Sequence, residues 1–375
     1  MSKRNAWVQI GIFIAFIALF FILNLVLPDK DFSPQENRYL QQLPKFSFSD
    51  LFSGKFTKDF EKYTTDQFTL RDTWTTLKAR CELASGKKEN NGVYYCGDNT
   101  LITRFDAPAD ETLDKNMSYV NALADNVGDE ARVYFALIPG AAEIWKDKLP
   151  ENAPNDSQLR IIEKAYGQCR AQTVDMYSEL NAHKDEYIFY RTDHHWTSLG
   201  AFYGYTSLCG ALGLDAPQLS DYSPRTVSED FYGTVYSSSG MSWIAPDSIQ
   251  IFREDDGSFK LTNYPKGTPV EGKLYDESFL EKKDKYAMFM GGNTPLLTIE
   301  TDNTDAPSIL ILRDSYMDSL TPFLLDNFSN IHIIDLRYYR TSIADYVREN
   351  NIDNVLVCYS VVNFSTDQNL FLMAK

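Results

Sequence analysis

The chain is poor in the residues that build metal sites. Its five cysteines are scattered and include no Cys-x-x-Cys pair, so they match no metal motif. An odd count leaves at least one thiol unpaired. An oxidising compartment permits a Cys81–Cys96 disulfide, but we favour burial of the cysteines as small apolar side chains. Histidine is also scarce, with four residues in 375. We therefore expect no metal site and no cofactor.

The chain also lacks an excess of positive charge. It has 36 Lys and Arg against 52 Asp and Glu, a formal net charge of -16. Phosphate binding needs clustered basic side chains, so this balance excludes nucleic acid as the expected partner. Hydrophobic residues make up 43% of the chain and charged residues 23%, which is typical of globular proteins. The length allows one large domain or two ordinary ones.

Only one long apolar run is present, at residues 6–27, and Gln9 and Asn24 are its only polar interruptions. At about 1.5 Å per residue, a helix of this length crosses a hydrocarbon core of about 30 Å. Lys3 and Arg4 precede the run, which places the N-terminus in the cytoplasm and the remaining chain on the extracellular or periplasmic side. The run is therefore predicted to be a transmembrane anchor.

A cleaved signal peptide is the alternative interpretation of this run. A signal peptide has a shorter apolar core and a small-residue cleavage site. Here the run ends Leu25-Val26-Leu27-Pro28, which favours an uncleaved anchor.

The rest of the chain divides by composition. We expect a cytoplasmic stub at 1–5, the anchor at 6–27, a polar linker with a helical segment at 28–90, and an α/β domain at 91–375. Within this domain, residues from about 215 to 304 are irregular and rich in Gly, Pro, Ser and Asp. We expect this insertion to hold β hairpins and substrate-facing loops.

Short apolar runs alternate with helical patterns through the α/β domain. The predicted strands are 92–95, 132–138, 186–190, 309–312, 331–334 and 355–358. The predicted helices are 51–85, 156–179, one capped by Thr197 and stopped by Gly213, 318–328 and 342–349. The C-terminal β-α-β-α-β order predicts right-handed crossovers and a parallel sheet. Ligands bind beyond the carboxyl ends of such strands.

Polar residues that suit nucleophilic catalysis follow these predicted strands. Asp193 and His195 come after 186–190 and, in an extended segment, point to one side while His194 points to the other. Ser315 comes just after 309–312, at the start of a helix. These three residue types supply a nucleophile, a base that takes its proton and a carboxylate that orients the base.

Six other positions complete the candidate site. The Tyr316 N–H, Arg337 and Asn363 are candidate oxyanion donors, since they lie at the same predicted sheet edge. Trp196 and the Tyr338-Tyr339 pair are candidates for stacking on sugar rings.

Each of these residues also has a structural interpretation. His195 can be an ordinary buried imidazole, Ser315 a helix cap and Asn363 a turn residue. Arg337 can pair with Asp335 or Asp314. Aromatic side chains such as Trp196 after a strand often belong to the core.

A metal site formed by Asp193, His194 and His195 is a further alternative. We disfavour it because adjacent histidine side chains diverge in an extended segment.

The sequence resembles a known family. Asp193-His194-His195-Trp196 is similar to the signature of the bacterial DHHW proteins, relatives of the periplasmic alginate O-acetylation proteins. The fold of those proteins resembles a circularly permuted SGNH hydrolase. Shorter similar pieces lie along the ectodomain: Glu36-Asn37-Arg38, Asp66-Gln67-Phe68 with Arg71, Gly92-Val93-Tyr94 and Gly291-Gly292-Asn293.

The resemblance implies roles for individual residues. The family's Asp-x-His falls on Asp193 and His195, and its later serine falls on Ser315. Arg337 takes the place of the second SGNH block and Asn363 that of the third. Arg313-Asp314-Ser315 stands where the SGNH pattern has Gly-Asp-Ser.

The activity implied is an extracytoplasmic O-acetyltransferase that acts on a cell-surface or secreted polysaccharide. A polytopic membrane-bound O-acyltransferase is the implied partner that supplies acyl groups across the bilayer. A secreted carbohydrate esterase with the same triad, and a non-catalytic glycan-binding or scaffold protein, are the alternatives.

Overall fold

The computed structural model describes residues 3–375, so the first two residues of the expected cytoplasmic stub lie outside the described residues. The chain forms two compact units. The first contains residues up to 91 together with 236–243, and the second contains 92–235 together with 244–375. Helix α10 (Thr234–Ser239) covers the point where the chain passes from the second unit to the first.

The first unit is largely helical. Helix α1 (Lys3–Val26) covers most of the predicted anchor, and among residues 3–375 it is the one helix long and apolar enough to cross a membrane. The other elements are a hairpin of β1 (Phe32–Ser33) and β2 (Arg38–Tyr39), helices α2 (Phe48–Phe52), α3 (Lys55–Asp66) and α4 (Arg71–Ala84), and strand β3 (Glu89–Asn90). The helix predicted at 51–85 is therefore interrupted twice. Gly54 and Leu70, both with positive φ, stand at the two breaks.

The second unit is a mixed α/β domain built on a large, mostly parallel sheet. Its eight strands lie in the order β11-β10-β12-β14-β13-β15-β6-β7. Neighbours from β14 to β7 are parallel, and β12, β10 and β11 extend the sheet with antiparallel pairs. The strand bounds are β6 (Arg132–Ile138), β7 (Gln172–Val174), β10 (Phe259–Asn263), β11 (Val270–Glu271), β12 (Leu296–Thr301), β13 (Ser308–Arg313), β14 (Asn330–Ile334) and β15 (Asn354–Ser360).

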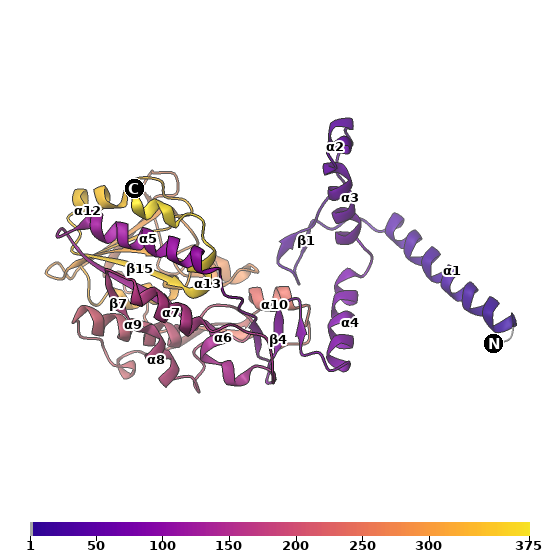
Figure 1. The fold of residues 1–375 in the computed structure, drawn as a ribbon, viewed down its shortest axis with the longest axis horizontal. Helices are drawn as coiled ribbons and strands as arrows, with labels where there is room; N and C mark the ends of the chain where they lie inside the picture. Colours follow the sequence, from indigo (N-terminus) through magenta and orange to yellow (C-terminus); the bar gives the residue numbers. More distant parts are fainter. Residues whose placement is uncertain (1–2) are drawn as a thin grey trace. The chain divides into compact units, whose positions relative to one another are not determined.

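Helices cover both faces of this sheet. In Figure 1, α5 and α12 lie on one side of β15, and α8 and α9 lie on the other. Consequently β13 and β15 are buried along their whole length, as expected of a parallel sheet covered on both faces. The helices are α5 (Asp110–Val127), α6 (Ala141–Ile144), α7 (Gln158–Gly167), α8 (Met176–Ala182), α9 (Ser198–Leu212), α11 (Met317–Leu324), α12 (Ile343–Asn350) and α13 (Val361–Thr366).

Small antiparallel pairs and 3₁₀ turns complete the second unit. Strand β4 (Val93–Tyr95) pairs with β5 (Leu101–Thr103), and β8 (Arg225–Phe231) pairs with β9 (Asp247–Ile251). The 3₁₀ helices are η1 (Lys146–Lys148), η2 (Leu219–Asp221), η3 (Glu277–Glu281), η4 (Tyr286–Met288) and η5 (Leu370–Ala374).

Several predicted elements are confirmed with their local signals. Strands β4, β6, β13, β14 and β15 lie where expected. Thr197 caps α9 by accepting a hydrogen bond from the Gly200 N–H, and Gly213 ends this helix in the left-handed conformation.

Two further predicted elements are wrong, besides the interrupted helix at 51–85. The helix predicted at 156–179 is divided into α7, β7 and α8, because the chain turns after Gly167 and Asp175 caps a new helix. The strand predicted at 186–190 does not form. Its backbone bonds instead to the turn that follows, where Tyr190 N donates to His195 O and Thr197 N to Ile188 O.

The five cysteines, all within the described part of the chain, form no disulfide. Cys209 and Cys358 are buried, Cys96 and Cys169 are half-buried, and Cys81 is exposed.

Candidate active site

Ser315 lies two residues after β13, at the carboxyl end of the parallel strands. The preceding residue, Asp314, is buried and organises this turn. Its carboxylate accepts hydrogen bonds from Tyr316 N at 3.1 Å, from Ser360 N at 2.8 Å and from Asn363 Nδ2 at 2.8 Å. Because Ser360 ends β15, Asp314 ties together the ends of two neighbouring strands. Ser315 itself is partly exposed.

The Asp193–Trp196 segment lies in the turn that leads into α9. Buried Asp247, at the start of β9, holds the beginning of this turn. It accepts hydrogen bonds from Thr192 N at 2.7 Å, from Thr192 Oγ1 at 2.5 Å and from Arg191 N at 3.0 Å. The backbone before Asp193 is therefore fixed by the insertion and not by the main sheet.

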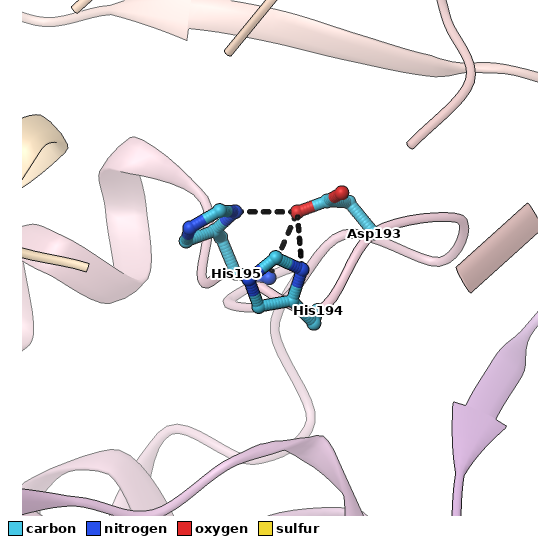
Figure 2. Close-up of side chains that lie close together, drawn as sticks. All are labelled: Asp193, His194 and His195. Atoms are coloured by element: carbon cyan, nitrogen blue, oxygen red, sulfur yellow. Dashed lines mark hydrogen bonds and ion pairs between the residues drawn. The ribbon is translucent and has the colours of Figure 1, made fainter. Parts of the chain in front are cut away.

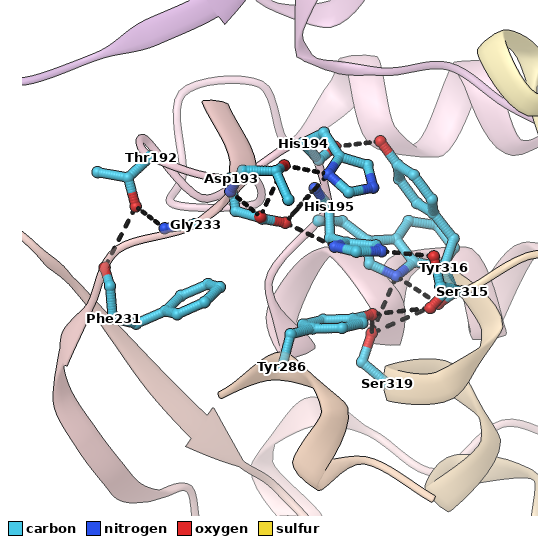
Figure 3. Close-up of polar contacts among 12 residues, drawn as sticks. Thr192, Asp193, His194, His195, Phe231, Gly233, Tyr286, Ser315, Tyr316 and Ser319 are labelled. Carbon is cyan, nitrogen blue, oxygen red and sulfur yellow. Dashed lines mark hydrogen bonds and ion pairs between the residues drawn. The ribbon is translucent and has the colours of Figure 1, made fainter. Parts of the chain in front are cut away.

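A continuous chain of hydrogen bonds joins Asp193, His195 and Ser315 (Figure 3). His195 Nδ1 lies 2.6 Å from Asp193 Oδ1, and His195 Nε2 lies 2.7 Å from Ser315 Oγ. Asp193 Oδ1 also accepts from His195 N, while Oδ2 accepts from Thr234 N at 2.8 Å and from Thr234 Oγ1 at 3.1 Å. This arrangement gives the base an orienting carboxylate and places the serine proton within reach.

The groups around these hydrogen bonds favour the ionised form of the Asp193 carboxyl group. Burial opposes ionisation of Asp193, but His194, His195 and the hydrogen bonds it accepts hold the pKa of Asp193 well below the usual carboxyl range. A permanently ionised Asp193 stabilises an imidazolium at His195 when that ring takes a proton.

His194 does not point away from its neighbours, contrary to the prediction. Figure 2 shows all three side chains together: the two imidazole rings lie 3.8 Å apart, and His194 Nδ1 is 3.5 Å from Asp193 Oδ1. The prediction was wrong because this segment is a turn and not an extended strand. His194 Nδ1 also lies 2.7 Å from Thr234 Oγ1, and partial desolvation together with His195 lowers the pKa of His194, although 41% of its side chain is exposed.

The same cluster has the composition of a possible metal site. One ligand atom from each of Asp193, His194 and His195 lies within 4.8 Å of the others. However, Nδ1 of His195 already forms a hydrogen bond with Asp193, and Nε2 of His195 forms one with Ser315. A metal ion would have to displace one of these contacts.

Two residues of the insertion complete the site and were missed from the sequence. The ring of Tyr286 stacks on His195, with centroids 3.8 Å apart and an interplanar angle of 8°. The Tyr286 hydroxyl donates to Ser315 O at 3.1 Å and to Ser319 Oγ at 3.0 Å (Figure 3). Gly233 lies against Asp193, where no side chain fits. Neither residue carries a periodic signal, and Tyr286 is one of 23 tyrosines.

The predicted oxyanion donors have other partners in this structure. The Tyr316 N–H donates to Asp314 Oδ1, and the Asn363 amide donates to Asp314 Oδ2. Arg337 pairs with Asp335, with Nη2 2.6 Å from Oδ2 and Nε 2.9 Å from Oδ1. The alternative interpretation, in which Arg337 forms a structural ion pair with Asp335, therefore fits the observed contacts.

The three aromatic candidates differ in exposure, and Tyr339 is half-buried against the core. Trp196 is fully buried, and its Nε1 donates to Tyr316 O at 2.9 Å and to Ser319 Oγ at 3.0 Å. Of the two interpretations of Trp196, the core position fits and sugar stacking does not, because its ring is enclosed between α9 and α11. Gly204 makes room for this ring. Tyr338 is half-exposed, with the Arg337 guanidinium 5.7 Å from its ring centre.

A pocket of about 380 Å³ opens at the carboxyl ends of β13, β14 and β15. Its lining residues are Arg313, Asp314, Arg337, Tyr359, Asn363, Thr366, Asp367, Gln368 and Asn369. The Tyr359 hydroxyl and Arg313 Nε are buried and have no hydrogen-bond partner among the described residues. A larger pocket, of about 860 Å³, lies at the opposite edge of the sheet, near Arg132 and Asn354. The triad therefore lies nearer the smaller pocket.

A buried ion pair lies beside this pocket. Arg313 Nη2 is 3.0 Å from Asp318 Oδ1, and both side chains are almost fully buried. Burial raises the pKa of Asp318 to about 7, although Arg313 opposes this. Asp318 therefore titrates near neutral pH.

Solved structures share this fold. A DHHW family protein from Eubacterium siraeum matches with a TM-score of 0.66 and 26% identity, covering 76% of this chain and 95% of that chain. Bacillus cereus PatB1 with a sulfonyl adduct matches with a TM-score of 0.63 and 22% identity, covering 76% and 98%. At 22% identity, the match to PatB1 shows the fold alone.

Sequence comparison gives a shorter match. A protein of Pseudomonas syringae pv. tomato named "Probable alginate O-acetylase AlgJ" is 25% identical over 190 residues, 48% of this chain and 49% of the relative. This chain spans about half the length of the curated relatives it matches.

The DHHW protein family model matches residues 83–334, more than half of the chain and a range that includes Asp193, His195 and Ser315. The chain belongs to the DHHW family.

Proposed function

We propose that this protein is an O-acetyltransferase that uses Ser315 as a nucleophile to modify a cell-surface or secreted polysaccharide. Relatives named for alginate O-acetylation support an O-acetyltransferase-like function. The observation that carries the serine chemistry is the hydrogen-bond chain from Asp193 through His195 to Ser315.

The reaction takes two steps. Ser315 Oγ attacks the acyl carbonyl of the donor while His195 Nε2 takes the hydroxyl proton. The donor's leaving group then departs with this proton, which leaves an ester on Ser315. In the second step, His195 takes the proton of an acceptor hydroxyl, whose oxygen attacks the ester. Ser315 recovers its proton, and the acceptor carries the acyl group.

The pocket beside Asn363 is the proposed acceptor site. Pockets that bind small ligands are commonly about 300–1,000 Å³, so a volume of about 380 Å³ suits a sugar unit of a glycan. The exposed side chains of Arg337, Thr366 and Gln368 line this pocket and can hydrogen-bond to sugar hydroxyls. Tyr338, which is half-exposed, is a candidate for stacking nearby.

We further propose that α1 anchors the protein with its N-terminus in the cytoplasm and the rest outside. A membrane-bound O-acyltransferase is then the proposed source of acyl groups. The motif order, with Asp193 and His195 before Ser315, agrees with a circularly permuted SGNH arrangement.

Covalent labelling tests the nucleophile. The protein is treated with a serine-directed phosphonate, and the adduct is located by peptide mass spectrometry. We expect one adduct on Ser315, lost in Ser315→Ala and strongly slowed in His195→Ala. His183→Ala, which removes an imidazole at the end of α8, should label as the wild type does. Equal labelling of all variants would exclude Ser315 as the nucleophile.

Product analysis separates transferase from esterase. Wild type and Ser315→Ala are incubated with p-nitrophenyl acetate, with and without oligosaccharide. A transferase gives acetylated oligosaccharide that depends on Ser315, whereas an esterase gives only acetate. Absence of both products, with no effect of Ser315→Ala in cells, would favour a non-catalytic glycan-binding protein.

A further inference from the structure

Asn24, the polar interruption near the end of the apolar helix α1, has a specific partner in the first unit. Its side-chain oxygen accepts hydrogen bonds from Thr69 N and Thr69 Oγ1, both at 2.8 Å. Its amide group donates to Phe20 O at 2.9 Å. The polar atoms of Asn24 are therefore used to hold the α3–α4 junction against the last turns of α1.

Aromatic contacts extend this attachment along α1. Phe68 stacks on Phe20 with centroids 5.8 Å apart, and Trp74 lies 5.6 Å from Phe20 and 6.4 Å from Phe16. Phe20 and Phe16 precede the end of α1 at Val26 by six and ten residues. At about 1.5 Å per residue, they lie about 9 and 15 Å below that end.

This depth has a direct consequence if α1 spans the bilayer. A hydrocarbon core is about 30 Å thick, so Phe16 and Phe20 lie in its outer half. Side chains that contact them, Phe68 and Trp74, must then lie at similar depth. They do not lie in the water above the membrane.

Three apolar side chains at this junction are exposed, beside the exposed polar residues Thr73, Lys78 and Arg80 of α4. Phe68 is 41% exposed, Leu70 59% and Leu77 46%. Leu70 is also strained, because it adopts the left-handed conformation with φ of 58°. A bulky residue seldom takes this conformation, and such strain persists where the surrounding structure imposes it.

An ion-pair network imposes the conformation of the junction. Arg38 donates two hydrogen bonds to the Asp66 carboxylate, at 2.6 and 2.8 Å, and a third to Glu36 at 2.7 Å. Arg71 pairs with Glu36 from the other side at 2.5 Å. Asp66 is almost fully buried, and Arg38 lowers the pKa of Asp66 to about 2 despite this burial. This network joins the hairpin β1–β2 to both ends of the junction.

We propose that Phe68, Leu70, Trp74 and Leu77 form a membrane wedge that enters the outer leaflet beside α1. The occupant of this surface is lipid acyl chain, since the wedge continues the exposed apolar surface of α1 at the same depth. The inference rests on the proposed membrane anchor. In this arrangement α1 is not a free tether, because the wedge holds the first unit at the bilayer surface.

Photolabelling from within the bilayer tests the wedge. The full chain is reconstituted in phosphatidylcholine vesicles that contain a phosphatidylcholine with a diazirine in its acyl chain. After irradiation, labelled residues are located by peptide mass spectrometry. We expect labels on α1 and on the peptide that contains residues 68–77.

A paired substitution sharpens the test. Leu70→Asn with Leu77→Gln should lose the 68–77 label while α1 stays labelled, and Asn accepts the left-handed conformation at position 70. Leu51→Gln, the same kind of change at an exposed leucine of α2, should leave the 68–77 label unchanged. Labels on α1 alone in the wild type would overturn the wedge but keep the anchor. Absence of label on α1 itself would overturn the anchor and, with it, the wedge.

Discussion

Gly233 lies so close to Asp193 that a Cβ atom added to the glycine would be 2.2 Å from the Cβ of Asp193 and 2.3 Å from its Oδ2. The next residue, Thr234, donates two hydrogen bonds to the same oxygen. A backbone segment of the insertion is therefore in direct contact with the Asp193 carboxylate, which is hydrogen-bonded to His195.

Gly233→Ala should displace Asp193 and reduce turnover. A misplacement of about 1 Å in a catalytic group can lower the rate about 100-fold, and we expect a loss of this order in kcat for p-nitrophenyl acetate. Gly210→Ala is the matched control, because position 210 of α9 has open space around it. That change should leave kcat unchanged and keep or slightly raise the unfolding temperature. Equal activity of the two variants would contradict the role of Gly233.

Asp193→Asn should preserve the fold but remove the charge that orients His195. Loss of the equivalent charge in a serine triad lowers kcat by about 10⁴-fold, since the imidazole takes the wrong tautomer. We expect a comparable fall in the rate of Ser315 phosphonylation, measured by intact mass against time. A decrease smaller than tenfold would show that Asp193 does not act through His195.

Tyr286 should act as a positioning residue through its ring. Tyr286→Phe keeps the stack on His195 and loses hydrogen bonds to Ser315 O and Ser319 Oγ. We expect this change to lower the free energy of unfolding by about 1–3 kcal/mol with a small effect on kcat. Tyr286→Leu also removes the stack, so kcat should fall further while KM stays near the wild-type value. If kcat of the Leu variant equals that of the Phe variant, the ring does not position His195.

Asp318 should make stability depend on pH. Its pKa is raised from 3.8 to about 7 by burial, so the folded protein binds this proton more tightly than the unfolded chain. The resulting stabilisation is full below about pH 4 and is lost as the pH rises through about 7. The side chain of Asn in the Asp318→Asn variant has no carboxyl proton, so this pH-dependent contribution is absent from the variant. Between pH 4 and 8, the free energy of unfolding of the wild type should therefore fall relative to that of the variant, by on the order of a few kcal/mol.

Chemical denaturation at a series of pH values measures this difference. Asp305→Asn, at an exposed position, controls for the loss of a carboxylate. A constant difference between wild type and Asp318→Asn across the range would contradict the assignment.

Chelation should leave the serine chemistry intact. The hydrogen bonds of His195 to Asp193 and Ser315 use both of its ring nitrogens. We therefore expect phosphonate labelling of Ser315 to proceed at the same rate with and without EDTA. A labelling rate that falls in EDTA and recovers with added Zn²⁺ would favour the metal alternative at Asp193, His194 and His195.

The sequence was most informative where one physical signal decides the structure locally. Strands such as β13 and β15 are continuous apolar runs that can only be buried between two helical layers. The caps at Thr197 and Gly213 mark α9 in the same local way. The rule that ligands bind at the carboxyl ends of parallel strands led to Ser315 and the neighbouring Asn363.

Prediction failed where the backbone bonds to distant or irregular partners. Residues 186–190 are apolar enough for a strand, but their N–H and C=O groups bond to the turn at 195–197. The edge strand β7 is only three residues long and follows its helix without a clear pattern. Similarly, His194 was expected to point away from Asp193 and His195, which holds only for an extended backbone. The backbone at His194 is a turn, so the prediction failed.

The sequence by itself therefore determined the family, the parallel core and the residue types of a serine triad, because these follow from local patterns of apolarity and from a short motif. Only the tertiary structure decided which groups surround those residues. Tyr286, Gly233 and Asp247 reach the site from an insertion without periodicity, so no local signal marks them. Their roles arise from contacts with residues 40 to 91 positions away in the chain (Gly233 with Asp193, Asp247 with Thr192, Tyr286 with His195), which only the folded structure brings together.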